Sequence, residues 1–280
     1  MKKFLLTMQY EEKFLLPIFI KHYSQYFPLN CIYVIDHGSS ENFAPEGINR
    51  IYIPRDRNFS ERDRLQLVSN IAHGLLRYYD YGVYADCDEL IALSYLNESE
   101  FTNNSVVYVC GFDCYLEELS GKKRILGLVN PGICKPLIFR ETPNWNQGFH
   151  LSTPHPPQLK LSIPMGHIRY LFLSQIANRV DIRKKVYQSL VSEERDRGVA
   201  LHWNDGEKEL KYFYAHSSML RQKNTNVSNF NSIERKHLFD EQVSLGIYVK
   251  KNFYIPKVSD YKLLETRFDL TDIFPELINY

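Results

Sequence analysis

Strong net charge, long apolar runs and glycine-rich loops are all missing from this 280-residue sequence. The formal net charge is only +1 at pH 7. A protein that binds nucleic acid mainly through phosphate contacts has a large excess of basic residues, so this charge argues against that class. No stretch approaches the roughly 18 apolar residues of a membrane-spanning helix. The absence of a glycine-rich phosphate loop argues against a phosphohydrolase or a nucleotidyltransferase. We therefore expect no nucleic-acid partner and no membrane span.

Cysteine is scarce and has no recognisable pattern. The five cysteines lack metal-finger spacing, and no second Cys or His pair completes the one formed by Cys110 and Cys114. Their odd number is typical of a reducing compartment. The apolar run at the N-terminus ends at residues 9–12, which is too early for a signal peptide. These observations predict a cytoplasmic protein with reduced cysteines.

Short apolar runs alternate with helical patterns over residues 1–90. The apolar content of 44% is that of an ordinary core. Apolar runs predict strands at residues 4–8, 32–35, 51–54 and 81–85, and periodic apolar residues predict helices at 11–26 and 61–79. This alternation indicates an α/β fold with a mostly parallel central sheet flanked by helices.

Three acids directly follow the strand predicted at 81–85. Side chains alternate along an extended backbone, so we expect Asp86 and Asp88 to point the same way. Two carboxylates at such a short distance repel each other unless a cation lies between them. A hard divalent cation such as Mn²⁺ or Mg²⁺ is typically bound by oxygen ligands. The alternative is a solvated acidic turn at a strand end. Asp36 also follows a predicted strand, and ligands of such sheets bind beyond the carboxyl ends of the strands. Asp36, Asp86 and Asp88 are therefore expected to converge.

The N-terminal two thirds of the chain resemble a known family. The segments that carry the resemblance are Glu11-Glu12 with Leu16-Pro17 and His22-Tyr23, Val34-Ile35-Asp36-His37-Gly38-Ser39-Ser40, Tyr84-Ala85-Asp86-Cys87-Asp88-Glu89-Leu90, Cys134-Lys135-Pro136, Gly148-Phe149-His150 and Gly166-His167-Ile168-Arg169-Tyr170. Together they resemble the GT-A-fold glycosyltransferases, close to the family 2-like bacterial enzymes. The resemblance implies a metal-dependent transferase in which Asp36 binds the nucleoside, Asp86 the ribose or the metal, and Asp88 the metal.

Two histidines and a basic segment are further candidates for this site. His150 and His167 are candidate metal ligands, although His150 can equally be a hydrogen-bonded residue of a packed tryptophan loop. Arg169 lies two residues after His167 and is a candidate for a phosphate oxygen of the donor. The segment 178–190 predicts a basic helix, whose cations either stabilise a leaving diphosphate or simply face solvent.

A carboxylate is needed to take the proton from the acceptor hydroxyl in inverting glycosyl transfer, the outcome that the resemblance implies. The apolar run 106–112 predicts a buried strand that ends at Asp113, which makes Asp113 the candidate base. Glu117, Glu118 and Glu141 compete for this role. The alternative for Asp113 is a surface turn.

We expect two parts in the chain. Residues 1–190 are expected to form the GT-A-like domain, and residues 191–280 a mainly helical extension with helices at 207–220 and 232–245. Cations and aromatics at 250–254 suit either an anionic bilayer, at the inner face of the membrane, or an ordinary surface. The expected function is transfer of a sugar from a nucleotide-sugar donor to a glycan or lipid-linked acceptor in surface polysaccharide synthesis. The alternative is a GT-A-like protein that binds a nucleotide or glycan without turnover.

Overall fold

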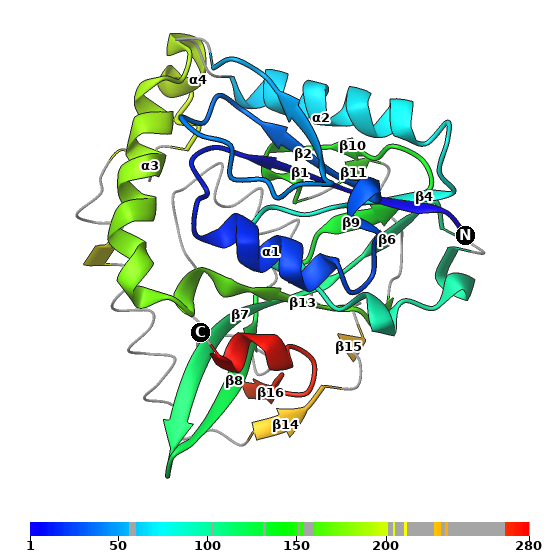
Figure 1. Cartoon of the computed structure of the whole chain (residues 1–280), viewed down its shortest axis with the longest axis vertical. Helices are drawn as coiled ribbons and strands as arrows, with labels where there is room; N and C mark the ends of the chain where they lie inside the picture. The colour runs from blue at the N-terminus through cyan, green and yellow to red at the C-terminus, as the bar shows by residue number, and fades with distance from the viewer. Residues whose placement is uncertain are drawn as a thin grey trace.

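The structure is a computed structural model of the whole chain (Figure 1). The residues that it describes are 1–55, 60–101, 104–130, 133–150, 152–153, 160–200, 204, 210–211, 227–230, 233–234 and 267–279. Within them the chain is a mixed α/β protein with two six-stranded sheets.

The first sheet carries the alternating pattern predicted from the sequence. Its strands, in spatial order, are β3 (Asn49–Tyr52), β2 (Ile32–Asp36), β1 (Lys3–Gln9), β4 (Tyr81–Tyr84), β9 (Pro136–Phe139) and β6 (Val106–Tyr108). The four strands from β3 to β4 are parallel, whereas β9 and β6 join in antiparallel pairs. The predicted parallel sheet is thus confirmed for four of the six strands.

The second sheet is mostly antiparallel and was not predicted. Its order is β14 (Val227–Asn229), β16 (Arg267–Asp269), β8 (Lys122–Val129), β7 (Cys110–Leu119), β13 (Pro164–His167) and β5 (Glu89–Ile91). β7 and β8 form a long hairpin that projects at the bottom of Figure 1. Its turn residues Ser120 and Gly121 both have positive φ, as a tight hairpin turn requires. Two short ribbons pair β10 (Asn144–Trp145) with β11 (Ser152–Thr153) and β12 (Lys160–Leu161) with β15 (Ile233–Glu234).

Four α-helices and several 3₁₀ turns are described. They are α1 (Leu15–Tyr23), α2 (Glu61–Leu75), α3 (Ile176–Gln188) and α4 (Ser192–Asp196), with 3₁₀ turns η1 (Leu29–Cys31), η2 (Leu93–Tyr95), η3 (Glu98–Phe101), η5 (Gln147–Phe149), η6 (Ile168–Tyr170), η7 (Leu173–Gln175) and η10 (Pro275–Asn279). Of these four helices only α2 begins with a side-chain cap. Ser60 caps α2 by accepting from the Asp63 amide over 3.1 Å. α1 begins later than predicted, because Glu11 has a positive φ of 55°, which a right-handed helix does not allow. Ahead of the helix, the amides of Glu11 and Glu12 donate to the side chains of Ser39 and Gln9.

The strand predicted at 106–112 is instead divided between the two sheets. The Val109 amide donates to the Lys135 carbonyl, while the Cys110 amide donates to the Ile163 carbonyl, so the backbone changes sheet at this point. β7 then continues through Asp113 to Leu119. The prediction that Asp113 lies at the end of a strand is therefore wrong.

The described part of residues 191–280 contributes strands to the second sheet. β14 and β16 extend that sheet beyond β8, and η10 (red in Figure 1) lies beside α1. Apart from the helical residues 210–211, the helices predicted at 207–220 and 232–245 lie outside the described residues, as does the segment 250–254. The division at residue 190 stays a prediction. In the described ranges, every helix is too short or too polar to cross a membrane.

Candidate functional site

Several buried ionisable side chains gather where β4 leads into β5 and where β13 lies between β5 and β7. Residues 86–89 form a turn. In it the Glu89 amide donates to the Asp86 carbonyl over 2.8 Å, and the Asp86 amide donates to the Glu89 carboxylate over 3.2 Å. The expectation of an extended backbone with Asp86 and Asp88 on one face is therefore wrong, because the strand ends at Tyr84. Instead, the two aspartates meet different cations.

Asp86 lies among two cations and a tyrosine. The Tyr84 hydroxyl donates to it over 2.9 Å, the Lys135 ammonium lies 3.4 Å away, and the Arg64 guanidinium lies 4.0 Å away. Lys135 also contacts Glu89 at 2.5 Å, so it bridges two carboxylates. Burial by itself raises the pKa of Asp86, but Lys135 and Arg64 outweigh burial and hold this pKa below its usual value. Asp86 is consequently ionised at neutral pH.

Asp88 lies between an arginine and a histidine. Its Oδ2 accepts from Arg179 Nη2 over 2.7 Å and lies 3.0 Å from His167 Nε2. Burial opposes ionisation here too, yet Arg179 and His167 keep the pKa of Asp88 well below its usual value. α3 thus brings a basic side chain to the acidic turn, as its basic pattern allowed (left of Figure 1).

Asp113 is joined to Asp88 through His167. The Nδ1 of His167 lies 3.1 Å from Asp113 Oδ1, which also accepts from Arg169 over 3.3 Å. Asn130 Nδ2 donates to Asp113 Oδ2 over 2.7 Å. With only 3% of its surface exposed, Asp113 is not in a surface turn. Four of the predicted site residues, Asp88, Asp113, His167 and Arg169, therefore belong to one bonded chain.

The carboxylates that competed with Asp113 lie elsewhere. Glu117 is further along β7 and pairs with Arg124 at 2.6 Å and with Arg267 at 3.2 Å. Glu118 and Glu141 are exposed.

Asp36 has partners of its own. Its carboxylate accepts from the Ser39 amide over 3.0 Å and pairs with Arg50 at 2.6 Å. β1 separates β2 from β4, and within the described residues no hydrogen bond or ion pair of Asp36 reaches Asp86 or Asp88. The structure thus places Asp36 in a buried position at the end of β2, and its role toward a nucleoside stays a prediction.

The tryptophan loop is packed, as the structural alternative predicted. Trp145 Nε1 donates to the Pro136 carbonyl over 2.9 Å, and its ring contacts the rings of Tyr84 and Phe149. His150 follows η5 and is exposed. Its role as a metal ligand stays a prediction.

Some members of this cluster had no individual sequence signal. Arg64 on α2 and Asn130 after β8 bond to the acids but were not singled out, and Lys135 before β9 was named only within a segment of the resemblance, without a role of its own. Arg179 was part of a predicted basic helix without being chosen from it. Glu12 adds one more carboxyl near Arg179, and burial raises its pKa despite that cation. In the sequence, residues of this kind differ from other polar residues only in lying beside an apolar run.

A divalent metal can be accommodated by part of this set. Among the described residues no three His, Cys, Asp or Glu side chains form a complete metal site. Asp88 and His167, however, place an oxygen and a nitrogen 3.0 Å apart, close enough to be neighbouring ligands of an ion whose bonds are about 2.1 Å long. Ions such as Mg²⁺ take one or two protein ligands and complete their shell with water and phosphate. The residues present therefore fit a metal–diphosphate site better than an all-protein metal cage.

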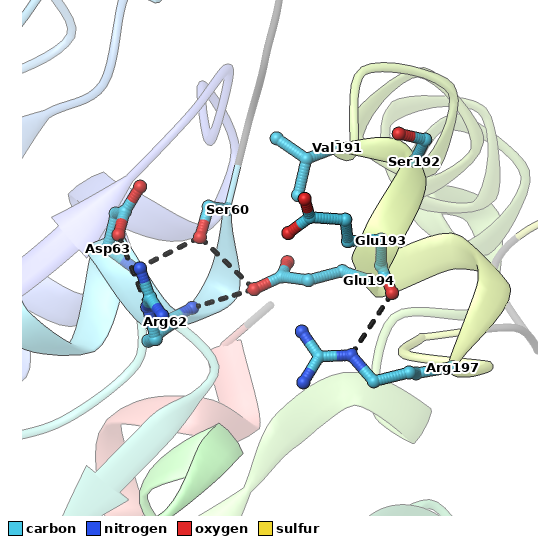
Figure 2. A pocket seen from close by; sticks show the side chains of 8 residues that line it. All are labelled: Ser60, Arg62, Asp63, Val191, Ser192, Glu193, Glu194 and Arg197. Carbon is cyan, nitrogen blue, oxygen red and sulfur yellow. Dashed lines mark hydrogen bonds and ion pairs between the residues drawn. The ribbon is translucent and has the colours of Figure 1, made fainter.

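A cavity of about 320 Å³ lies apart from the acidic turn (Figure 2). It is lined by Ser60, Arg62, Asp63, Val191, Ser192, Glu193, Glu194 and Arg197. Figure 2 shows Glu194 of α4 reaching to the first residues of α2, where it accepts from the Ser60 hydroxyl. None of the predicted site residues lines this cavity.

In comparisons with known proteins, no family model and no curated protein matches the chain.

Proposed function

We propose that the protein is a metal-dependent glycosyltransferase of the GT-A type, which moves a sugar from a nucleotide-sugar donor to a glycan or lipid-linked acceptor with inversion. The observation that carries the proposal is the buried pair of Asp88 and His167 beside the end of a parallel strand, with Arg179 bonded to Asp88 and Arg169 bonded to the neighbouring Asp113. Strand carboxyl ends are where α/β sheets bind ligands. A neutral sugar needs no such group of charges, but a diphosphate does.

The residues of the cluster have distinct parts in this proposal. Asp88 and His167 would hold Mn²⁺ or Mg²⁺, which supplies charge neutralisation to the leaving diphosphate. Arg179 now donates to Asp88, and a diphosphate oxygen would offer its guanidinium a second acceptor. Lys135 keeps Asp86 ionised and held in place for the donor. Arg169, next to Asp113, faces the same group of charges. We place this activity in the cytoplasm, where nucleotide sugars are made.

One observation favours the second candidate, a GT-A-like protein that binds a nucleotide or glycan without turnover. Both aspartates already have cationic partners, Asp86 with Lys135 and Asp88 with Arg179. A site with balanced charge can hold a ligand without catalysing a reaction. Release of free nucleotide from a bound nucleotide sugar, with sugar transferred to an acceptor, separates the two functions.

The proposal is tested by thermal unfolding of the full chain with a panel of nucleotide sugars, with and without Mn²⁺. A ligand at about 100 times its dissociation constant adds about 2.7 kcal/mol of stability, which corresponds to roughly 5–10 °C for a chain of this size. We expect this shift for at least one nucleotide sugar, and only when Mn²⁺ is present. The absence of any Mn²⁺-dependent shift would overturn the proposal.

The variant Asp88→Asn should lose this Mn²⁺-dependent shift, because it removes the charge that pairs with the metal and with Arg179. Each variant is compared with its own ligand-free midpoint, so a general loss of stability does not obscure the result. Asp181→Asn is the control, since Asp181 is an exposed acid on α3. An Asp88→Asn protein that keeps the full Mn²⁺-dependent shift would remove Asp88 from the site.

A further inference from the structure

The backbone holds His167 between two acidic segments. His167 is the last residue of β13, where it is paired with Asp113 of β7 on one side and with Glu89 of β5 on the other. The amide of the next residue, Ile168, donates to the Asp88 carbonyl over 2.9 Å. The backbone position of His167 is therefore set by two neighbouring strands, and the orientation of its ring is left to side-chain contacts.

Each ring nitrogen of His167 faces a different carboxylate. Nε2 lies 3.0 Å from Asp88, and Nδ1 lies 3.1 Å from Asp113. Only 5% of His167 is exposed, so water has little access to either nitrogen. A carboxylate on one nitrogen of a histidine fixes the ring and directs the other nitrogen, which is the arrangement by which proteins orient metal-binding histidines.

The Asp113 carboxylate accepts hydrogen bonds from two further side chains. Asn130 donates to its Oδ2 over 2.7 Å, and Arg169 donates to its Oδ1 over 3.3 Å. Both carboxylate oxygens therefore already accept hydrogen bonds within the protein. A general base must come within hydrogen-bond reach of the acceptor hydroxyl, and a buried carboxylate with this set of partners is poorly placed for that.

We propose that Asp113 is a positioning residue, which orients His167 so that Nε2 is directed at the metal position beside Asp88, rather than the catalytic base. Asn130 and Arg169 hold Asp113 in this orientation. The inference rests on the proposed function, because it takes Asp88 and His167 as the residues that hold the metal. It changes the role that the sequence suggested for Asp113 from proton transfer to metal affinity.

The test measures Mn²⁺ binding to the full chain by the electron paramagnetic resonance signal of free Mn²⁺, without nucleotide. Loss of a residue that orients a metal-binding histidine typically weakens metal binding by about 10–100-fold. We expect Asp113→Asn and Asp113→Ala to raise the Mn²⁺ dissociation constant by this factor. Asn130→Ala, which leaves both Asp113 and His167 in place, should raise it less and serves as the second variant if Asp113→Ala does not fold.

Glu276→Gln is the matched control. Glu276 makes a carboxylate–histidine pair of the same kind, 2.6 Å from His22 Nδ1, but on the C-terminal turn η10. Its replacement should leave the Mn²⁺ dissociation constant unchanged. Equal weakening in Glu276→Gln and Asp113→Asn would show a general effect of loosening the protein and would overturn the inference.

Kinetics at saturating Mn²⁺ separate the two roles of Asp113. A positioning residue is compensated by excess metal, so kcat of Asp113→Asn should largely recover as Mn²⁺ is raised. Loss of a general base instead lowers kcat by about 10²–10⁴-fold at any Mn²⁺ concentration and leaves Mn²⁺ affinity unchanged. That second pattern would overturn the inference while the proposed function stands. A wild-type protein that binds no Mn²⁺ would overturn both.

Discussion

His22 is a buried histidine whose two ring nitrogens both meet acceptors. Nδ1 lies 2.6 Å from the Glu276 carboxylate and Nε2 lies 2.9 Å from the Ile91 carbonyl, while only 1% of the residue is exposed. The next residue, Tyr23, accepts from the Ile91 amide and donates to the Glu89 carbonyl through its hydroxyl. Two adjacent side chains of α1 thus join β5, which leaves the acidic turn, to the C-terminal turn η10.

Glu276 should make stability depend on pH in the acid range. Burial raises the pKa of Glu276, but the hydrogen bond from His22, a backbone hydrogen bond and the nearby charges of His22 and Lys21 together outweigh burial and lower this pKa. Because the folded-state pKa lies below the unfolded value of about 4.3, this contribution is present above that pH and is lost as pH falls through the folded-state pKa. The difference in free energy of unfolding between wild type and Glu276→Gln should therefore shrink on going from pH 6 to pH 3, measured by urea unfolding. A difference that stays constant over this range would contradict the assignment.

α2 begins with hydrogen bonds to a carboxylate of another helix. Glu194 of α4 accepts from the Arg62 amide and from the Ser60 hydroxyl, each over 3.1 Å (Figure 2). It also accepts from the Glu61 amide over 2.8 Å. Ser60 in turn accepts from the Asp63 amide. The first amides of a helix have no partner within the helix, and a carboxylate there also meets the positive end of the helix dipole. α4 and α2 are joined by these bonds.

Substitutions that remove part of this cap should lower the free energy of unfolding, and the loss should grow with the number of amides left without an acceptor. We expect Ser60→Ala to lower the free energy of unfolding by about 1 kcal/mol. Glu194→Ala leaves the buried amide of Glu61 and the partly buried amide of Arg62 without this acceptor and should cost about 1–3 kcal/mol. Its exposed neighbour is the control, and Glu193→Ala should change stability by no more than about 0.5 kcal/mol. Equal values for the two glutamate variants in urea unfolding would show that the cap contributes little.

The two sheets come into close contact where β7 passes the segment before β9. A Cβ atom on Gly111 would collide with the carbonyl oxygen of Ile133, a backbone atom that cannot move aside as a flexible side chain can. The Asn130 amide donates to the Gly111 carbonyl over 2.9 Å, and the Gly111 amide donates to Cys134 Sγ over 3.3 Å. Gly111 lies two residues before Asp113 on β7, so the packing between the two sheets also fixes the backbone position of Asp113.

Alanine at two glycines should have opposite effects on the stability of the whole molecule. Gly111→Ala should lower the free energy of unfolding by about 1–3 kcal/mol or more, because it overpacks the contact between the sheets. Gly74 lies in α2 with no atom within 4 Å of a Cβ placed there, so Gly74→Ala should raise stability by up to about 1 kcal/mol. Thermal midpoints that move in the same direction for both variants would contradict this interpretation.

The elements that could be predicted are those that depend on residues close together in the sequence. The apolar runs located β1, β2 and β4, and the periodic apolar positions located α1 and α2, because burial of one face repeats along the chain at the period of the element. The bounds were less accurate at the ends of the elements. α1, for example, begins at Leu15 and not at residue 11, because Glu11 has a positive φ of 55° that a right-handed helix does not allow.

The chain order of strands did not predict the second sheet. β7 and β8 are adjacent in sequence, but their neighbours β13 and β16 come from 164–167 and 267–269. Pairing at such separations leaves no periodic trace in a single sequence. For the same reason the sequence predicted Asp113 at the end of a strand, whereas the structure has it within β7.

The sequence by itself determined that acids follow a buried strand of an alternating α/β pattern, because both features depend on neighbouring residues. Only the tertiary structure decided which cation each acid meets. Asp86 and Lys135 are 49 residues apart, Asp113 and His167 are 54 apart, and Asp88 and Arg179 are 91 apart. Burial raises the free energy of an unpaired charge, so each carboxylate in the interior requires a partner, but the identity of that partner depends on which strands and helices the fold brings beside it.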